Sequence, residues 1–125
     1  MTRHVLLVDD EADIREVARI SLEAVSGWRV TTAASGAEAL ERAVADRPEA
    51  IVLDVMMPDL DGPAVVERLD AREETRAIPV ILLTAKAQDS DRRRFEALGV
   101  AGMLAKPFDP MTLGERIAAL MGWDR

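Results

Sequence analysis

The stretch AIVLDVMMP, residues 50–58, combines an apolar run of strand length with a single carboxylate at its end. A continuous apolar run between Pro48 and Pro58 is typical of a strand buried on both faces, as in a parallel sheet covered by helices. A carboxylate inside such a strand would be costly to bury, whereas Asp54 at its end lies where open α/β sheets bind their ligands. Asp54 can also be a solvated residue that opens a loop, so the rest of the chain decides between the two interpretations.

The rest of the chain repeats the same strand-then-helix unit. Apolar runs predict further strands over residues 4–8, 28–33, 79–84 and 100–105, and amphipathic segments after them predict helices. Strands that alternate with helices through short loops form a parallel sheet with right-handed crossovers. The sequence therefore predicts an α/β fold in a single domain over residues 1–125. The helices are expected over residues 12–25, between Ser35 and Pro48, over 63–72, from Asp89 or Ser90 to Gly99, and from Pro110 onward.

Several residues mark the ends and the inner faces of these helices. Ser35 and Glu38 form a capping-box motif at the start of the second helix. Pro63 suits a first helical position, where its missing N–H is not needed. The first helix is expected to turn five apolar residues towards the core: Ile14, Val17, Ala18, Leu22 and Val25.

The composition is that of a soluble globular domain, with 49% hydrophobic and 31% charged residues. The net charge of −7 argues against binding of nucleic acid or an anionic membrane by this domain. There is no cysteine, which excludes disulfide and thiol chemistry. The first apolar stretch is too short for a signal peptide and no segment approaches the length of a membrane span. We therefore expect a cytoplasmic protein.

Polar residues stand at the C-terminal ends of the predicted strands. Asp9 and Asp10 follow the first strand, Asp54 and Thr84 end the third and fourth, and Lys106 follows the fifth. Because these ends of parallel strands lie along one edge of a sheet, the five residues are expected to meet in one cleft. Three carboxylates there repel each other by roughly a few kcal/mol per pair. A hard divalent cation such as Mg²⁺ would relieve that repulsion.

This set of residue types suits phosphoryl transfer. A carboxylate beside a divalent cation can attack phosphorus as a nucleophile and form an aspartyl phosphate. The cation and Lys106 would then stabilise the charge on the phosphoryl oxygens, and the hydroxyl of Thr84 could donate a hydrogen bond to one of them.

Four motifs stand in order along the chain: VDDE at residues 8–11, LDVMMP at 53–58 with Asp61-Gly62 after it, LTA at 83–85 and KPF at 106–108. In this order and spacing, over essentially the whole length, the chain resembles the receiver domains of two-component response regulators, a flavodoxin-like family that includes the chemotaxis regulator. The resemblance implies a five-stranded parallel sheet of order 2-1-3-4-5 with helices on both faces. It also implies a cis peptide bond between Lys106 and Pro107.

The resemblance further implies a signalling role rather than an enzymatic one. Asp54 would accept a phosphoryl group from the phosphohistidine of a histidine kinase or phosphotransfer protein. Phosphorylation would switch a surface made by the fourth helix, the fifth strand and the fifth helix, where an unknown downstream protein binds. The implied Mg²⁺ ligands are Asp10, Asp54 and the backbone carbonyl of Met56, with Asp9 acting through metal-bound water; Thr84 and Lys106 would contact the phosphoryl group.

Three positions near the expected site bear on how this chain would work as a receiver domain. Met103 stands three residues before the lysine, where receiver domains usually have an aromatic residue whose ring moves on activation, so this chain lacks the ring on which an aromatic switch depends. Met56 and Lys86 stand two residues beyond Asp54 and Thr84. In this family those positions line the path of attacking water, and these long side chains are expected to prolong the phosphorylated state.

Two other functions compete with this interpretation. A Mg²⁺-dependent phosphatase of the haloacid-dehalogenase type also uses an aspartate nucleophile after a strand, but it needs a second aspartate two residues later, where this chain has Met56. A degenerate receiver that only binds protein is the other alternative, and the intact set of acids argues against it. Whether the chain stands alone or is part of a longer regulator stays open.

Overall fold

The computed structural model describes residues 2–85 and 89–123, with only the backbone at 89–91. Within this part of the chain, no helix has both the length and the apolar character needed to cross a membrane. The strands are β1 (His4–Val8), β2 (Arg29–Ala33), β3 (Ala50–Asp54), β4 (Val80–Thr84) and β5 (Gly102–Ala105). The helices are α1 (Ala12–Ala24), α2 (Gly36–Asp46), α3 (Gly62–Asp70), α4 (Asp89–Glu96) and α5 (Leu113–Met121).

The strands form one parallel sheet in the order β2-β1-β3-β4-β5, which confirms the predicted order. β2 lies beside β1 on one edge of the sheet, and the chain then crosses back so that β3 lies on the opposite side of β1. The loops after β1 and β3 therefore diverge at the C-terminal edge, the position where such sheets bind ligands. The register aligns Val8 with Leu53 and Asp54 with Leu83, so the strand ends lie level with one another.

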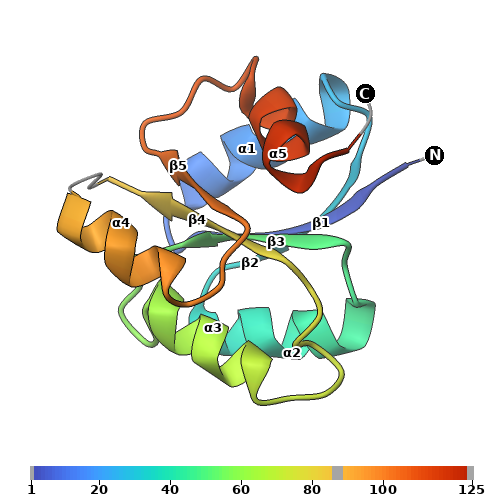
Figure 1. Cartoon of the computed structure of the whole chain (residues 1–125). Helices are drawn as coiled ribbons and strands as arrows, with labels where there is room; N and C mark the ends of the chain where they lie inside the picture. The colour runs from blue at the N-terminus through green and yellow to red at the C-terminus, as the bar shows by residue number, and fades with distance from the viewer. Residues whose placement is uncertain (1, 86–88, 124–125) are drawn as a thin grey trace.

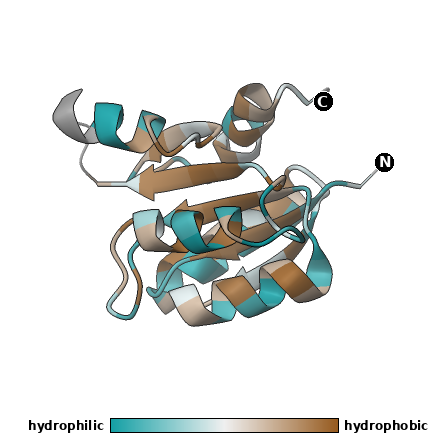
Figure 2. Cartoon of the chain, turned by 60° about the horizontal axis from the view of Figure 1, so that its bottom comes forward, coloured by the Kyte–Doolittle hydropathy of each residue, from teal (hydrophilic) through white to brown (hydrophobic). Residues whose placement is uncertain are grey.

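Helices cover both faces of the sheet. α1 and α5 pack on one face, and α2, α3 and α4 lie on the other (Figure 1). Because side chains alternate along a strand, Leu6 and Val8 of β1 join one apolar layer while Val5 and Leu7 join the other. The strands are hydrophobic along most of their length, whereas the helices show one hydrophobic and one hydrophilic side (Figure 2). The strands thus lie between two apolar layers, and polar residues stand at the strand ends and in the loops after them.

Side chains cap two helices at the C-terminal edge of the sheet. The Oγ of Ser35 accepts the N–H of Glu38 at 3.1 Å, as the capping-box motif predicts. The carboxylate of Glu38 accepts the N–H of Ala34 at 2.7 Å, one residue before the cap. Asp61 caps α3 by accepting the N–H of Ala64 at 2.9 Å. These bonds set where each helix begins relative to the loops.

The last helix starts later than the sequence predicts. It begins at Leu113 and not at Pro110. The side chain of Asp109 accepts the N–H of Met111 at 2.9 Å, and its carbonyl accepts the N–H of Thr112 at 3.1 Å. Both bonds hold residues 109–112 in a turn, so the proline belongs to the turn rather than to the first helical position.

The face of α1 that contacts the sheet is narrower than expected. Ala18 and Leu22 are buried, but Val17 and Val25 are 46% and 49% exposed. Val25 is the C-cap residue, beyond the helix itself, and Val17 lines a pocket beside the functional site. The apolar pattern identifies the inner face of α1, but it does not show which apolar residues of that face the rest of the protein covers.

Candidate functional site

The C-terminal edge of the sheet gathers the polar residues that follow the strands. Asp9 follows β1 and is fully buried, Asp54 ends β3 and is 3% exposed, and Thr84 ends β4 and is also buried. Lys106 follows β5, and its backbone N–H donates to the carbonyl of Thr84 at 2.9 Å. The peptide bond between Lys106 and Pro107 is cis, as the resemblance implies.

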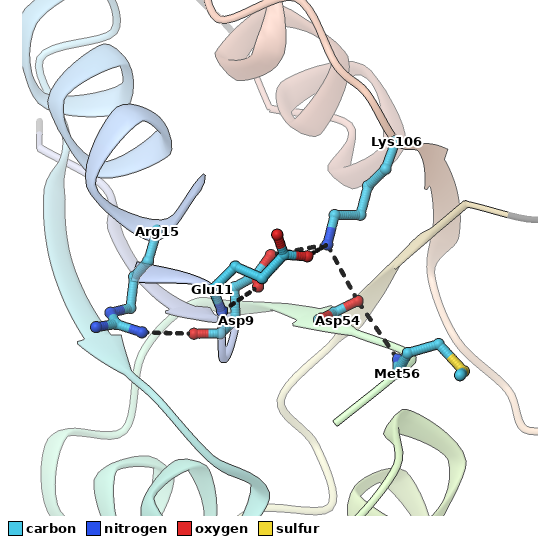
Figure 3. Close-up of polar contacts among 6 residues, drawn as sticks. All are labelled: Asp9, Glu11, Arg15, Asp54, Met56 and Lys106. Atoms are coloured by element: carbon cyan, nitrogen blue, oxygen red, sulfur yellow. Dashed lines mark hydrogen bonds and ion pairs between the residues drawn. The ribbon is translucent and has the colours of Figure 1, made fainter. Parts of the chain in front are cut away.

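Lys106 bridges the two buried carboxylates. Its Nζ lies 3.0 Å from Oδ2 of Asp9 and 3.4 Å from Oδ1 of Asp54. The carboxylate of Glu11, which is mostly exposed, lies 3.9 Å from the same nitrogen. Figure 3 shows the three acids converging on the ammonium group, which reaches them from the end of β5. One positive charge therefore lies among three negative charges.

Asp10 completes a compact cluster of acids. Carboxylate oxygens of Asp9, Asp10 and Asp54 lie within 4.8 Å of one another, although Asp10 is exposed and the other two are buried. Two unit charges at such a separation repel by roughly 3 kcal/mol at an effective dielectric constant of about 20. Lys106 can offset only part of this repulsion. A hard divalent cation that binds oxygen ligands suits the cluster.

The environment of Asp54 disfavours its ionised form. Burial raises the pKa of Asp54 from 3.8 to about 6, and the charge of Asp9 adds to the rise. The ammonium of Lys106 and the N–H of Met56, which donates to Oδ1 of Asp54 at 3.4 Å, oppose the rise without cancelling it. Burial lowers the pKa of Lys106, but its hydrogen bond to Asp9 and the charges of both acids outweigh burial and keep that pKa above its ordinary value. Lys106 is thus positively charged at neutral pH. A second cation beside Asp54 would further stabilise the ionised form of that carboxylate.

A pocket of about 510 Å³ opens beside Asp54. Its polar side includes Asp54, Lys106 and Glu11, and the side chain of Met56, which is 74% exposed, reaches it from the loop after β3. The remaining lining is mainly apolar and comes from α1 and from the segment after β5: Ile14, Val17, Pro107, Phe108 and Pro110. The pocket gives a molecule from outside a path to the carboxylate.

Two contacts at this edge of the sheet carried no sequence signal. The guanidinium of Arg15, in α1, donates to the backbone carbonyl of Asp9 at 2.8 Å (Figure 3). Asp59, in the loop after β3, accepts the backbone N–H groups of Gly36 and Ala37 at the start of α2. In both cases the partner is a backbone atom that the fold brings near, so residue type and spacing do not reveal it.

The chain is similar in sequence to bacterial transcriptional regulators. It is 39% identical over 121 residues to the alkaline phosphatase synthesis transcriptional regulatory protein PhoP of Bacillus subtilis, covering 97% of this chain and 49% of that protein. It is 42% identical over 117 residues to the transcriptional regulatory protein PrrA of Mycobacterium tuberculosis, covering 94% of this chain and 49% of that protein. The chain thus spans about half the length of the curated relatives it matches.

Solved structures agree with the sequence comparison. The chemotaxis response regulator CheY4 of Vibrio cholerae superposes with a TM-score of 0.89 at 32% identity, covering 96% of this chain and 99% of that one. The receiver domain of a sensor histidine kinase from Pseudomonas aeruginosa was solved with a magnesium ion coordinated in its active site cleft. It superposes with a TM-score of 0.85 at 34% identity, covering 98% of this chain and 99% of that one. The sequence pattern of the response regulator receiver domain matches residues 5–118. The chain therefore belongs to the response regulator receiver domain family, whose members are signalling domains of two-component systems.

Proposed function

We propose that this receiver domain takes a phosphoryl group onto Asp54 from the phosphohistidine of a histidine kinase or phosphotransfer protein. The observation that carries the proposal is the contact of Lys106 with Asp54 and Asp9 at the end of the central strands. A buried carboxylate at the mouth of a pocket, next to a fixed ammonium group, has both a nucleophilic oxygen and a cation for the incoming phosphoryl oxygens.

Mg²⁺ is the proposed cofactor. The acids fit it because three carboxylates offer oxygen atoms within 4.8 Å of one another and one lysine leaves their charge unbalanced. Asp10, Asp54 and the backbone carbonyl of Met56 would bind the ion directly, and Asp9 would act through a metal-bound water. When bound, Mg²⁺ supplies positive charge that attracts the phosphoryl oxygens and offsets the repulsion within the cluster.

In the proposed transfer, a carboxylate oxygen of Asp54 attacks phosphorus opposite the leaving nitrogen. The new P–O bond forms as the P–N bond breaks, and the imidazole nitrogen of the donor keeps the electron pair. Lys106 would move its hydrogen bond from the carboxylates to a phosphoryl oxygen, a short step because Nζ lies 3.4 Å from Oδ1 of Asp54. The hydroxyl of Thr84 would donate to another phosphoryl oxygen.

The exposed side chain of Met56 is proposed to slow hydrolysis of the aspartyl phosphate, in which water attacks phosphorus, the P–O bond to Asp54 breaks and inorganic phosphate leaves. It lines the pocket beside Asp54, which is the open side of the site. A long apolar side chain there would obstruct a water molecule that approaches phosphorus. Lys86, the other residue proposed for this role, lies outside the residues that the structure describes.

The proposed output surface consists of α4, β5 and α5. Met103 in β5 is half-buried and packs against the apolar layer under α2, α3 and α4. Because methionine fills space adaptably, we propose that this surface changes by gradual repacking and not by the flip of a ring. The named relatives are transcriptional regulators, so the proposed downstream partner acts in transcription. The acidic charge of this domain argues against direct contact with DNA.

Incubation with acetyl phosphate and Mg²⁺ tests the proposal. The expected result, by intact mass, is one added phosphoryl group that maps to Asp54, that needs Mg²⁺ and that is absent in Asp54→Asn. Asp61→Asn, which changes an acid of the same loop outside the cluster, is the matched control and should still be labelled. Continuous release of phosphate would indicate a phosphatase, and no label at all would indicate a degenerate receiver.

A further inference from the structure

Asp59 links the loop after β3 to a distant helix. Its Oδ1 accepts the N–H of Gly36 at 3.1 Å and its Oδ2 accepts the N–H of Ala37 at 2.9 Å, so each oxygen binds one amide in the first turn of α2. These hydrogen bonds hold the pKa of Asp59 below its ordinary value, as expected when they favour the ionised form. The positive end of the helix dipole favours the same charge.

A steric contact presses the same loop against α2. A Cβ added to Gly36 would lie 2.7 Å from Cβ of Leu60 and 3.1 Å from the carbonyl oxygen of Leu60. Leu60 therefore lies directly against the α-carbon of Gly36, a closeness that a glycine permits. Two neighbouring residues of the loop, Asp59 and Leu60, thus fit the first turn of α2 by different means.

The other contacts of the loop secure its two ends. At its start, the N–H of Gly62 donates to the carbonyl of Val55 at 2.8 Å and the side chain of Met57 is buried in the core. At its end, Asp61 caps α3. Asp59 lies between these points and is exposed. Its bonds to α2 hold the tip of the loop.

We propose that Asp59 is a positioning residue for Mg²⁺, because its bonds to α2 hold the loop, and with it the backbone of Met56, in the conformation that binds the ion. The inference rests on the proposed function, in which the carbonyl of Met56 is a ligand. Three peptide units separate Met56 from Asp59, and only the buried side chain of Met57 anchors the described residues between them, so a displacement of the tip is passed to the ligand through a short segment. When only a fraction of molecules holds the binding conformation, the apparent dissociation constant rises by the reciprocal of that fraction.

Asp59→Ala removes the link and should weaken Mg²⁺ binding by about threefold to tenfold. Linkage requires the reverse effect as well: Mg²⁺ should slow hydrogen exchange at the amides of Gly36 and Ala37. Ser35→Ala is the matched control. It removes the cap of the same helix, the bond from the N–H of Glu38, without touching the loop. Both substitutions remove hydrogen bonds from the first turn of α2, so a purely structural role would affect them alike.

The experiment is a Mg²⁺ titration of the full chain by calorimetry at pH 7.5, with amide exchange followed by NMR. The inference is supported when Asp59→Ala alone binds Mg²⁺ more weakly and Ser35→Ala stays within about twofold of the parent. Mg²⁺ should then protect the amides of Gly36 and Ala37 in the parent and in Ser35→Ala, but not in Asp59→Ala. Equal affinities in the two variants would overturn it. Asp59→Asn, which keeps one carbonyl acceptor, should be intermediate and serves if Asp59→Ala does not fold. A parent that fails to bind Mg²⁺ at all would instead refute the proposed function.

Discussion

Replacing Asp54 by asparagine should stabilise the protein at neutral pH. Asparagine has nearly the shape of the protonated aspartic acid but cannot ionise. The folded protein holds the proton of Asp54 up to a pKa of about 6, whereas the ordinary value is 3.8. Between these values the folded state binds the proton and the unfolded state does not, so protonation stabilises the fold at low pH. That stabilisation is lost as the pH rises through about 6.

The size of the effect follows from the rise in pKa. At about 1.36 kcal/mol per pKa unit, a rise from 3.8 to about 6 corresponds to an upper bound of about 3 kcal/mol above pH 7. Solvent at the open side of the pocket screens the charges, so we expect a gain of about 1–2 kcal/mol in Asp54→Asn at pH 7.5. The gain should shrink between pH 6 and pH 4 and disappear below pH 4, where both states of the parent are protonated.

Urea unfolding in EDTA between pH 4 and pH 8 measures this difference, with tryptophan fluorescence as the signal because Trp28 and Trp123 are half-buried. Glu67→Gln, which neutralises an exposed acid on α3 outside the cluster, should show no such pH-dependent gain. Added Mg²⁺ should stabilise the parent more than Asp54→Asn and narrow the gap. If the difference in free energy of unfolding between Asp54→Asn and the parent does not change with pH, burial and the charge of Asp9 do not destabilise the ionised group.

Other substitutions test separate parts of the site. Lys106→Gln leaves two buried carboxylates without a cation, so urea unfolding at pH 7.5 should show a loss of stability of about 1–3 kcal/mol. The loss should narrow towards pH 4 as Asp54, whose pKa burial raises to about 6, takes up its proton; a loss that does not depend on pH would contradict this. Met56→Ala should shorten the lifetime of the phosphorylated protein by about threefold or more while the midpoint in urea changes little, since an exposed side chain adds little to stability; an unchanged decay of label would refute the role of Met56. Gly36→Ala should destabilise the fold by about 1–3 kcal/mol, because the added methyl group meets Leu60, although alanine normally favours a helix over glycine; equal or greater stability in urea would show that Leu60 can move aside.

The sequence predicts the parts of this site that follow from strand ends. Asp9, Asp54 and Lys106 come together because parallel strands end at one edge, and apolar runs before those residues reveal the strands. Contacts made by loops and helix surfaces leave no such pattern. From the sequence, Asp59 cannot be told from any other acidic residue of a loop. Only the fold places the first turn of α2 within hydrogen-bond distance of it. The burial of Val17 was wrongly predicted for a similar reason, since helical periodicity cannot tell a core contact from the wall of a pocket.

The position of Lys106 connects the charge of the site to the edge of the sheet. Its side chain pairs with acids that follow β1 and end β3, while its backbone N–H bonds to the carbonyl of Thr84 at the end of β4. On the proposed mechanism, a phosphoryl group draws the ammonium away from Asp9 and Asp54, and any resulting shift of the backbone is felt first where β4 and β5 end. Met103 lies in β5 opposite Leu82, two residues before the last strand pair. A flexible side chain at that place can follow small displacements continuously, because it has no bulky ring that must clear a barrier. The response of the output surface should therefore grow with the displacement of Lys106, and Met103→Leu, with its stiffer branched side chain, should alter the chemical shifts of β5 on phosphorylation without changing how much phosphoryl group Asp54 accepts.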